Sequence, residues 1–366
     1  MKLPVDLWYP VLESREVRRK PLGVERLGQQ LVFWRDDAGL IHAHPDRCPH
    51  LGASLRGGKV EGDCLVCPFH GFEFNQEGNC VHIPAQGRSG KIPSGMALQT
   101  FPLTEAHGFI WLWLGSQRNV YPEVPFFPVL ESGWGYGSIK AEWPVHYTRA
   151  IENQLDVAHL AFVHRSTIGA GGRTFVDGPY VETDDHSIRV WVSNLHDPGR
   201  PSQSQQDLKK ASSLKDPGLH FIFPGIWLLN ISGRIKNLVA FVPVNERKTL
   251  YYVRTYHRIH PRWLAKPFEW VMGLSNRYIL EEDRRVIVTQ RPMDSGEADH
   301  DRLIGADRAI SQFRRIHQDL LATGVDVGDA GELTEKGTSH RAIDPRSDLD
   351  KEEGARPLSM LPPKSL

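Results

Sequence analysis

Two closely spaced cysteine–histidine pairs constrain this 366-residue chain more than any other feature. The segment 48–50 reads C-P-H and the segment 67–70 reads C-P-F-H, with sixteen residues between them. Each pair follows a predicted strand, so the two loops can face each other. Two thiolates on one iron and two imidazoles on the other match a 2Fe–2S cluster with a neutral histidine side and a raised potential. The pattern predicts a one-electron carrier whose ligands are Cys48, His50, Cys67 and His70.

A zinc site is the alternative explanation of the same residues. Cys64 would join three of them to make four tetrahedral ligands. Zinc sites usually pair cysteines at the C-x2-C spacing, and zinc would leave His50 without a role. The cluster is therefore favoured over a zinc-stabilised binding module. Cys64 and Cys80 are then expected to be strand or core residues, since free cysteine is commonly buried.

Short strands separated by turns surround the two pairs. The turn residues and the alternation of apolar side chains predict strands at 31–34, 41–44, 72–74, 81–83 and 108–115. The last of these, GFIWLWLG, reads as a buried aromatic-rich strand. Three prolines between residues 116 and 128 indicate a linker. A small antiparallel β domain is predicted, with its boundary near residue 120.

The second half of the chain mixes helical and strand patterns, so we expect an α+β fold. Helical periodicity runs through 145–164, 268–291 and 309–322, and strands are expected at 188–193, 220–231 and 238–244. After Gly324 the sequence becomes polar. We expect a cluster domain at 1–120, a catalytic domain at 121–323 and a polar tail at 324–366.

Charge and composition exclude several kinds of partner. The chain has 44 basic and 44 acidic residues and hence no net charge to attract nucleic acid or anionic lipid. No segment approaches the roughly 20 apolar residues that span a bilayer, and the first twelve residues lack the apolar core of a signal peptide. We expect a cytoplasmic protein that binds neither nucleic acid nor membranes.

A second group of polar residues lies on two predicted helices. In AIENQLDVAHLAFVHRSTIG (150–169), Asp156 and His159 lie opposite the apolar face, which is also what a solvated helix face would look like. In RYILEEDRRVIVTQ (277–290), Asp283 lies at the centre of the apolar stripe, whereas Glu281 and Glu282 are expected to point away. A carboxylate there needs a partner, which is either an arginine or a metal ion.

Four runs of sequence resemble a known family. WYPVLESREVRRKPLGV, LVFWRDDAGLIHAHPDRCPHLGASL, CLVCPFHGFEFNQEGN and GFIWLWLG are similar, over about a hundred residues, to the N-terminal domain of the Rieske non-heme iron oxygenases that hydroxylate aromatic rings or remove O-methyl groups. Leu51 stands where many members have arginine, and Phe72 where many have tryptophan. Respiratory Rieske proteins carry an extra disulfide-forming cysteine in each loop, but here Ala53 and Phe69 occupy those places.

The resemblance implies a mononuclear Fe(II) site in the second half. Asp156, His159 and His164 match the family's Asp-x2-His-x4-His pattern, and the family places its carboxylate ligand on a late helix, which points to Asp283. Asp156 is then the bridging carboxylate between an iron-ligating histidine and the exposed cluster histidine of an adjacent subunit. Histidines five residues apart point about 140° away from each other on a regular helix, so the helix must break between them.

The resemblance also implies the fold, the partners and the reaction. The catalytic domain would be a curved antiparallel sheet covered by helices, similar to a helix-grip fold, in a head-to-tail homotrimer. A separate reductase or ferredoxin would supply electrons for O2-dependent hydroxylation, dihydroxylation or oxidative demethylation of an apolar or aromatic small molecule. A Rieske electron-transfer protein without an oxygenase site is the alternative. Candidate substrate contacts, unless these residues are ordinary core, are Phe221, Phe223, Trp227 and Asn230.

Overall fold

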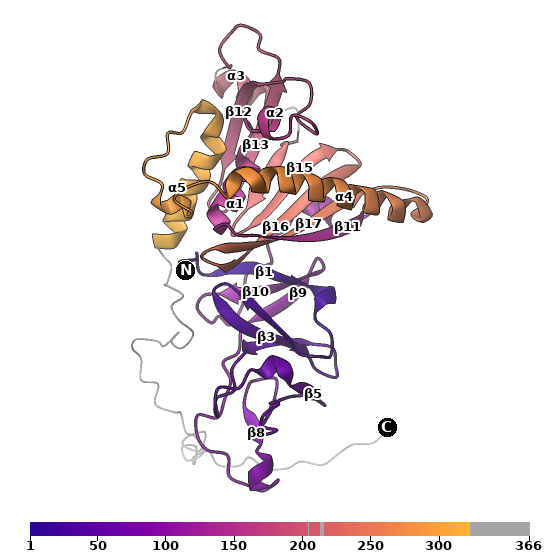
Figure 1. Cartoon of the computed structure of the whole chain (residues 1–366), viewed down its shortest axis with the longest axis vertical. Helices are drawn as coiled ribbons and strands as arrows, with labels where there is room; N and C mark the ends of the chain where they lie inside the picture. Colours follow the sequence, from indigo (N-terminus) through magenta and orange to yellow (C-terminus); the bar gives the residue numbers. More distant parts are fainter. Residues whose placement is uncertain (204, 213–215, 323–366) are drawn as a thin grey trace, which may run out of the picture. The chain divides into compact units, whose positions relative to one another are not determined.

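The computed structural model describes residues 1–203, 205–212 and 216–322. The polar tail expected at 324–366 lies outside these residues. The described part begins with small antiparallel sheets and continues into one large antiparallel sheet with helices (Figure 1). None of the described helices is long and apolar enough to cross a bilayer.

The first region consists of three small antiparallel sheets, so the predicted β domain is confirmed. Their strand orders are β1-β10-β9, β2-β3-β4 and β5-β6-β7-β8. The strands are β1 (Leu7–Glu13), β2 (Leu22–Arg26), β3 (Gln29–Arg35), β4 (Ile41–Pro45), β5 (Lys59–Glu61), β6 (Cys64–Val66), β7 (Glu73–Phe74), β8 (Cys80–His82), β9 (Leu103–Ala106) and β10 (Phe109–Leu114).

Local turn chemistry accounts for the hairpin that was expected at 31–34 and 41–44. Trp34 of β3 pairs with His42 of β4. Asp36 closes the turn, because its Oδ1 accepts the N–H of Leu40 at 2.8 Å. Gly39 has a φ of +82°, which favours glycine. The GFIWLWLG run forms β10, whose six residues are all buried in the central strand of its sheet.

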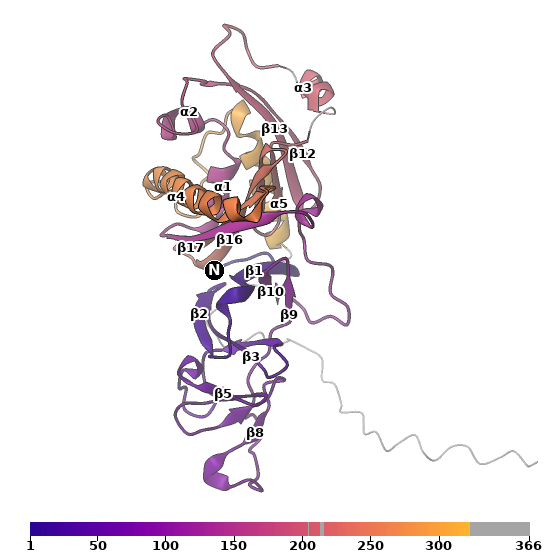
Figure 2. The same cartoon turned by 90° about the vertical axis from the view of Figure 1, so that its right-hand side faces the viewer.

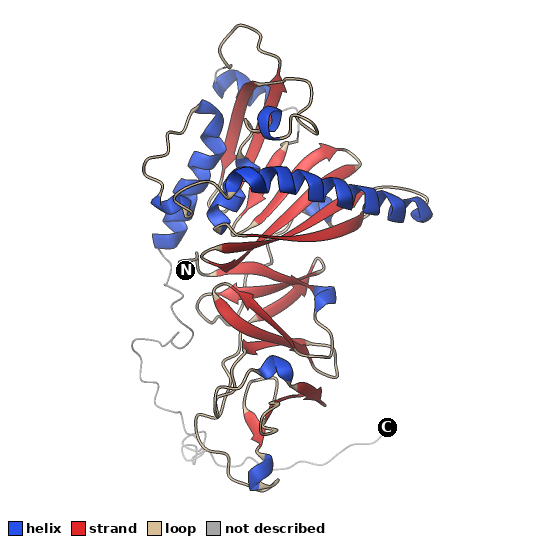
Figure 3. Ribbon diagram, in the orientation of Figure 1, coloured by secondary structure: helices blue, strands red, loops and turns tan. Residues whose placement is uncertain are grey.

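The second region is built on a seven-stranded antiparallel sheet, drawn in red in Figure 3. Its strand order is β11-β17-β16-β15-β14-β13-β12. The strands are β11 (Gly135–Trp143), β12 (Phe175–Thr183), β13 (Ser187–Leu195), β14 (Leu219–Ile222), β15 (Ile226–Ser232), β16 (Ile235–Asn245) and β17 (Lys248–His257). The helices are α1 (Tyr147–Leu155), α2 (Leu160–Val163), α3 (Gln205–Ser212), α4 (Arg262–Ile287) and α5 (Arg308–Ala322).

Helices α1, α4 and α5 cover one face of this sheet, and side chains alternate between the two faces (Figure 2). Tyr251 of β17 belongs to the core that includes Leu280 of α4 and Phe313 of α5. The neighbouring Tyr252 belongs to a second core that includes Trp111 of β10. The sheet therefore packs against the helices on one face and against β10 on the other.

A buried ion pair joins the two regions. Arg254 of β17 is 1% exposed, and its Nε donates to Oε1 of Glu13 at 2.9 Å. The same guanidinium donates to the carbonyls of His107 and Gly108 at 2.6 and 2.7 Å. The described residues form one compact unit.

Three predicted elements differ from the structure. The helix expected at 145–164 is two helices, α1 and α2, separated by residues 156–159. The strand expected at 220–231 is a hairpin of β14 and β15, because Pro224 and Gly225 interrupt the strand pattern. The helix expected at 268–291 begins earlier, at Arg262, and ends at Ile287. The α+β class and the helix-covered antiparallel sheet are confirmed.

Candidate metal centres

The first centre lies in two loops that have the same backbone pattern. In the loop after β4, the N–H of Cys48 donates to the carbonyl of Ala53, and the N–H of Gly52 donates to the carbonyl of Cys48. In the loop after β6, Cys67 and Gly71 make the equivalent bonds. Both glycines have a φ of +73°, a conformation that glycine adopts without strain. The two loops therefore present cysteine and histidine in matching positions.

The four predicted cluster residues lie together at the surface end of these loops. The rings of His50 and His70 have centroids 4.7 Å apart. Cys48 and Cys67 are buried, and burial together with the neighbouring Cys67 thiol raises the pKa of Cys48 to about 11. The neighbouring Leu51 and Phe69 are strongly exposed. The thiols thus face inward while the histidine side lies near solvent.

The donor set fits a two-iron cluster better than a single zinc ion. Among the described residues, one group of three or more potential ligands has all its ligand atoms within 4.8 Å of one another, as a single metal ion needs. That group lies in the second region and does not include the four cysteine and histidine residues of these loops. Separate cysteine and histidine pairs suit two irons, because each pair binds its own metal. Nδ1 of His50 is buried without a hydrogen-bond partner, as a nitrogen meant for a metal would be. Cys64 lies in β6 and Cys80 in β8.

The second centre brings together His159, His164 and Asp283, which offer ligand atoms within 4.8 Å of one another. Nε2 of His164 lies 2.9 Å from Oδ1 of Asp283, and Nε2 of His159 lies 3.6 Å from the same oxygen. His164 and Asp283 are buried, and His159 is half-buried. Asp283 also accepts from Nε2 of Gln154 at 3.4 Å, so its described partners do not include the arginine considered as an alternative.

Two helix ends, rather than one, bring the histidines together. The helix α1 ends at Leu155, and the side chain of Asp156 then accepts the N–H groups of Ala158 and His159 at 2.7 and 3.2 Å. The helix α2 ends at Val163, immediately before His164. The predicted break between the histidines is present, and the first break at 156–159 is an addition that the sequence analysis did not anticipate.

Each candidate ligand histidine has a second carboxylate beside its Nδ1. Oδ2 of Asp156 lies 3.7 Å from Nδ1 of His159. Oε2 of Glu282 lies 2.9 Å from Nδ1 of His164. The expectation that Glu282 points away from the site was wrong, because the segment after α2 covers that side of α4 and widens its buried face. Glu281 does point away and pairs with Arg284.

The electrostatics of the second centre favour a cation. Burial lowers the pKa of His164, but the carboxylates of Asp283 and Glu282 beside its ring outweigh burial and raise that pKa. Burial raises the pKa of Asp156, but the neighbouring His159 ring and the N–H groups of Ala158 and His159 outweigh burial and lower that pKa. Oδ1 of Asp283 has no hydrogen-bond partner although Nε2 of His164 is 2.9 Å away. Lone pairs that face one another in this way are the arrangement that a metal ion requires.

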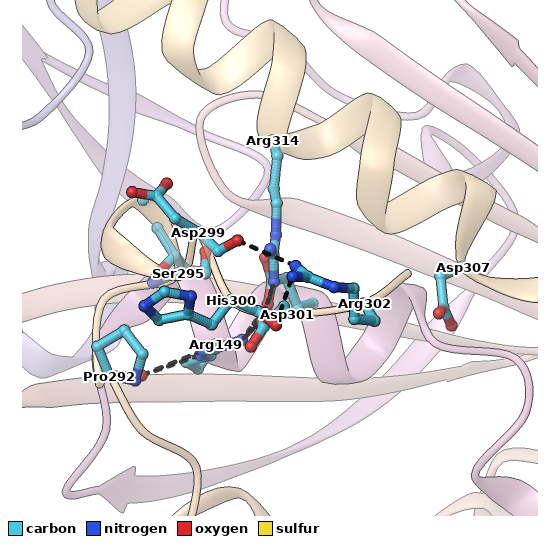
Figure 4. Close-up of polar contacts among 12 residues, drawn as sticks. Arg149, Pro292, Ser295, Asp299, His300, Asp301, Arg302, Asp307 and Arg314 are labelled. Carbon is cyan, nitrogen blue, oxygen red and sulfur yellow. Dashed lines mark hydrogen bonds and ion pairs between the residues drawn. The ribbon is translucent and has the colours of Figure 1, made fainter. Parts of the chain in front are cut away.

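A recess of about 390 Å³ opens beside Asp156. Arg149 and Arg314 both contact Asp301, at 2.9 and 2.7 Å (Figure 4). The same two arginines contact Glu152 at 3.1 and 2.7 Å. These contacts hold the segment after α4 against α1 and α5. Glu152 is therefore buried.

Three of the four candidate substrate contacts have structural partners. Phe221 and Phe223 pack against Phe313 of α5, and their ring centroids lie 5.7 and 5.5 Å, respectively, from that of Phe313. Asn230 accepts from Nζ of Lys236 at 2.7 Å. Trp227 is buried, and its Nε1 has no hydrogen-bond partner.

Comparison with known proteins identifies both regions. Residues 7–102 match the Rieske [2Fe-2S] domain, and residues 143–323 match the vanillate O-demethylase oxygenase C-terminal domain. A Comamonas testosteroni protein assigned as the toluene-4-sulfonate monooxygenase iron–sulfur subunit TsaM2 is 35% identical over 86% of this chain and 96% of its own length. The 4β-methylsterol monooxygenase of Methylococcus capsulatus is 29% identical over 85% of this chain and 86% of its own length.

Solved structures share the fold. Dicamba monooxygenase bound to 3,6-dichlorosalicylic acid superposes with a TM-score of 0.70 at 20% identity, covering 88% of this chain and 98% of the other. NdmA of Pseudomonas putida with caffeine gives a TM-score of 0.66 at 22% identity, covering 89% and 98%. The chain belongs to the Rieske non-heme iron oxygenases, as an oxygenase component with a 2Fe–2S cluster and a mononuclear iron that takes electrons from a separate reductase or ferredoxin.

Proposed function

We propose that His159, His164 and Asp283 bind the mononuclear iron, through Nε2 of each imidazole and Oδ1 of the carboxylate. The observation that carries this proposal is the convergence of their ligand atoms within 4.8 Å, reached from both ends of α2 and from α4. A 2-His-1-carboxylate set leaves open positions on Fe(II), where O2 is activated beside an organic substrate. Burial of His164 and Asp283 keeps water away from that position.

The cluster ligands are Cys48 and Cys67 on one iron and His50 and His70 on the other. The matching loops and the adjacent imidazole rings support this assignment. Asp156 connects the two centres, because its carboxylate lies beside Nδ1 of His159 and its side chain is 30% exposed toward solvent. The cluster domain is 1–120 and the catalytic domain is 121–323, with the polar tail following.

The reaction is O2-dependent hydroxylation, dihydroxylation or oxidative demethylation of an apolar or aromatic small molecule. We place the substrate between the iron and the helix-covered face of the sheet. Two buried donors on this side, the hydroxyl of Tyr251 and Nε1 of Trp227, have no hydrogen-bond partner. The buried cations Lys236 and Arg254 alternate onto the opposite face. The substrate therefore carries an uncharged oxygen acceptor, such as a carbonyl or ether, rather than a carboxylate.

Removal of one donor tests this substrate class. In Tyr251→Phe we expect KM for the best neutral substrate to rise up to about tenfold, because one neutral hydrogen bond is lost, with a smaller effect on kcat. For a substrate analogue without the acceptor oxygen, KM should be the same in the variant and in the wild type. Equal KM values for the oxygen-bearing substrate in both proteins would contradict the assignment.

A substrate screen tests the reaction itself. Methoxyarenes, sterol-like compounds and aromatic acids are offered to the purified protein with a surrogate reductase, and substrate-dependent O2 uptake is measured. We expect uptake with neutral methoxyarenes or sterol-like compounds and little with aromatic acids. A protein with only two irons per chain and no uptake with any compound would instead be an electron carrier.

The assembly is a head-to-tail homotrimer, in which the cluster tip of one subunit docks beside Asp156 of the next. The exposed Leu51 and Phe69 on the tip and the exposed Leu303 and Ile304 near the recess support such a contact. Mixing a Cys67→Ser variant with a His164→Ala variant tests it. Exchange of subunits should restore part of the activity, because each inactive variant supplies the centre that the other lacks. Full inactivity of the exchanged mixture would contradict electron transfer between subunits.

The compartment is the reducing cytoplasm. All four cysteines are free, and two of them are assigned to a metal cluster. Localisation of a tagged full-length chain by cell fractionation tests this assignment.

A further inference from the structure

Glu282 is a buried carboxylate whose hydrogen-bond partners all lie in one short segment. Its Oε2 accepts from Nδ1 of His164 at 2.9 Å and from the hydroxyl of Thr167 at 2.8 Å. Its Oε1 accepts from the hydroxyl of Ser166 at 3.2 Å. The side chain is 7% exposed. A buried carboxylate with three donors is fully satisfied, so residues 164–167 are attached to α4 before any metal binds.

The two candidate ligand histidines are therefore held in different ways. Nδ1 of His164 has a hydrogen bond, whereas Nδ1 of His159 has no hydrogen-bond partner and lies 3.7 Å from Asp156. Asp156 is partly exposed beside the recess. Of the two carboxylate–histidine pairs, the one with Glu282 is closed to solvent.

Glu282 also determines which nitrogen of His164 faces the metal position. The hydroxyls of Ser166 and Thr167 already donate to the two oxygens of the Glu282 carboxylate, so the imidazole nitrogen 2.9 Å from Oε2 meets an acceptor. The imidazole must then carry its proton on Nδ1. The Nε2 lone pair is left facing Oδ1 of Asp283, 2.9 Å away.

We infer that Glu282 is a positioning residue for the mononuclear iron, which holds His164 in the Nδ1–H tautomer and makes Nε2 a stronger ligand. The inference rests on the proposed ligand set. Consecutive residues of α4 then act on opposite sides of one ring, with Asp283 at the metal and Glu282 behind the histidine. A carboxylate behind a ligating histidine raises its basicity, and loss of such a partner typically weakens metal affinity about 10–100-fold.

Substitution of Glu282 and of its neighbour Glu281 provides a matched test. Glu282→Gln keeps an acceptor for His164 but removes the charge, and Glu282→Ala removes both. Glu281→Gln makes the same chemical change one residue away, at an exposed side chain paired with Arg284. Each protein keeps its cluster, is stripped of mononuclear iron with a chelator, and is titrated with Fe(II) and with Co(II), whose visible bands report ligand geometry.

We expect about tenfold weaker affinity in Glu282→Gln and up to about a hundredfold in Glu282→Ala, with shifted Co(II) bands. The cluster spectrum and the thermal midpoint of Glu282→Gln should match those of Glu281→Gln, whose metal affinity should equal that of the wild type. Wild-type affinity in both Glu282 variants, or an equal loss in Glu281→Gln, overturns the inference.

Two reference proteins keep the interpretation clear. Thr167→Val removes one of the three donors and should weaken metal affinity a few-fold, so it serves if Glu282→Gln does not fold. Wild-type metal affinity in both Thr167→Val and a folded Glu282→Ala would contradict the inference. In His164→Ala the third iron should be lost. If the wild type itself holds no third iron, the proposed ligand set has failed, whereas failure of the Glu282 variants alone concerns only this residue.

Discussion

The two candidate metal centres are built in opposite ways. The cluster residues come from two loops within residues 48–70, and the nearby Leu51 and Phe69 are 66% and 61% exposed. The mononuclear centre joins segments that are more than a hundred residues apart, since His164 and Glu282 are separated by 118 positions. Both Glu282 and Asp283 are buried.

This difference follows from what each centre must contact. An electron carrier exchanges electrons with another protein, so its histidine edge has to reach the surface. A site that activates O2 works best when water is excluded and its ligands are held rigidly. Local loops suffice for the exchange of electrons. The O2-activating site needs a sheet, two helices and a carboxylate beside each ligand histidine.

The largest test of the comparison is to empty one centre and leave the other. His159→Ala combined with His164→Ala should lower iron from about three to about two atoms per chain and abolish substrate oxidation, because the 2-His-1-carboxylate set is lost. The visible spectrum of the cluster should not change, since the cluster loops belong to the first region and the two histidines to the second. Metal analysis and absorption spectroscopy check this. A bleached spectrum would mean that the two centres depend on each other structurally.

The next test concerns the connection between the centres. Asp156→Asn should keep both metals but slow cluster oxidation about 10–100-fold in a single turnover with O2 and substrate, because the carboxylate beside His159 is replaced by a neutral amide. Stopped-flow absorbance of the reduced cluster measures the rate. The Glu282→Gln variant, if its mononuclear site is saturated with iron, should oxidise its cluster faster than Asp156→Asn. Wild-type kinetics in Asp156→Asn would argue against the bridge.

A third test asks how the stability of the first region responds to acid. His44 in the first region is completely buried, and burial lowers its pKa from 6.5 to about 4. The unfolded chain therefore binds a proton between about pH 6.5 and pH 4 that the folded chain does not bind. The resulting stability is present above pH 6.5 and is lost as the pH falls, by about 2 kcal/mol between pH 7 and pH 5.

Urea unfolding at both pH values checks this expectation in the wild type and in His44→Asn. Asparagine can still donate to the carbonyl of Gln99, which accepts from Nδ1 of His44 at 3.0 Å. The variant should lose about 2 kcal/mol less than the wild type on acidification. Parallel behaviour of the two proteins would show that His44 is not the group that titrates.

The smallest effect is expected at the exposed tip of the cluster loops. Leu51→Arg introduces the residue that many family members have, at a side chain that is 66% exposed. The free energy of unfolding should change by less than about 0.5 kcal/mol, as for most surface substitutions. Association with an acidic electron donor should become faster and more dependent on salt. An unchanged salt dependence would indicate that the donor docks elsewhere.

Some features of the site could be predicted because their cause is local. The spacing of cysteine and histidine in two turns indicated the cluster, and Asp283 stood out because a carboxylate in the middle of an apolar stripe needs a partner. The hairpin at Asp36 and Gly39 depends on neighbouring residues alone. The antiparallel β region and the α+β class followed from the same short-range patterns.

Other features depended on which segments pack together. Glu282 lies only one residue from Asp283, yet its burial required the segment 164–167 to cover that side of α4, which the periodicity of one helix does not reveal. Glu152 is likewise buried by tertiary packing, because Arg149 of α1 and Arg314 of α5 both pair with it. The sequence by itself determined the family and the cluster loops. Only the tertiary structure decided which carboxylate stands behind which histidine, because the buried face of a helix is set by its neighbours and not by its own pattern.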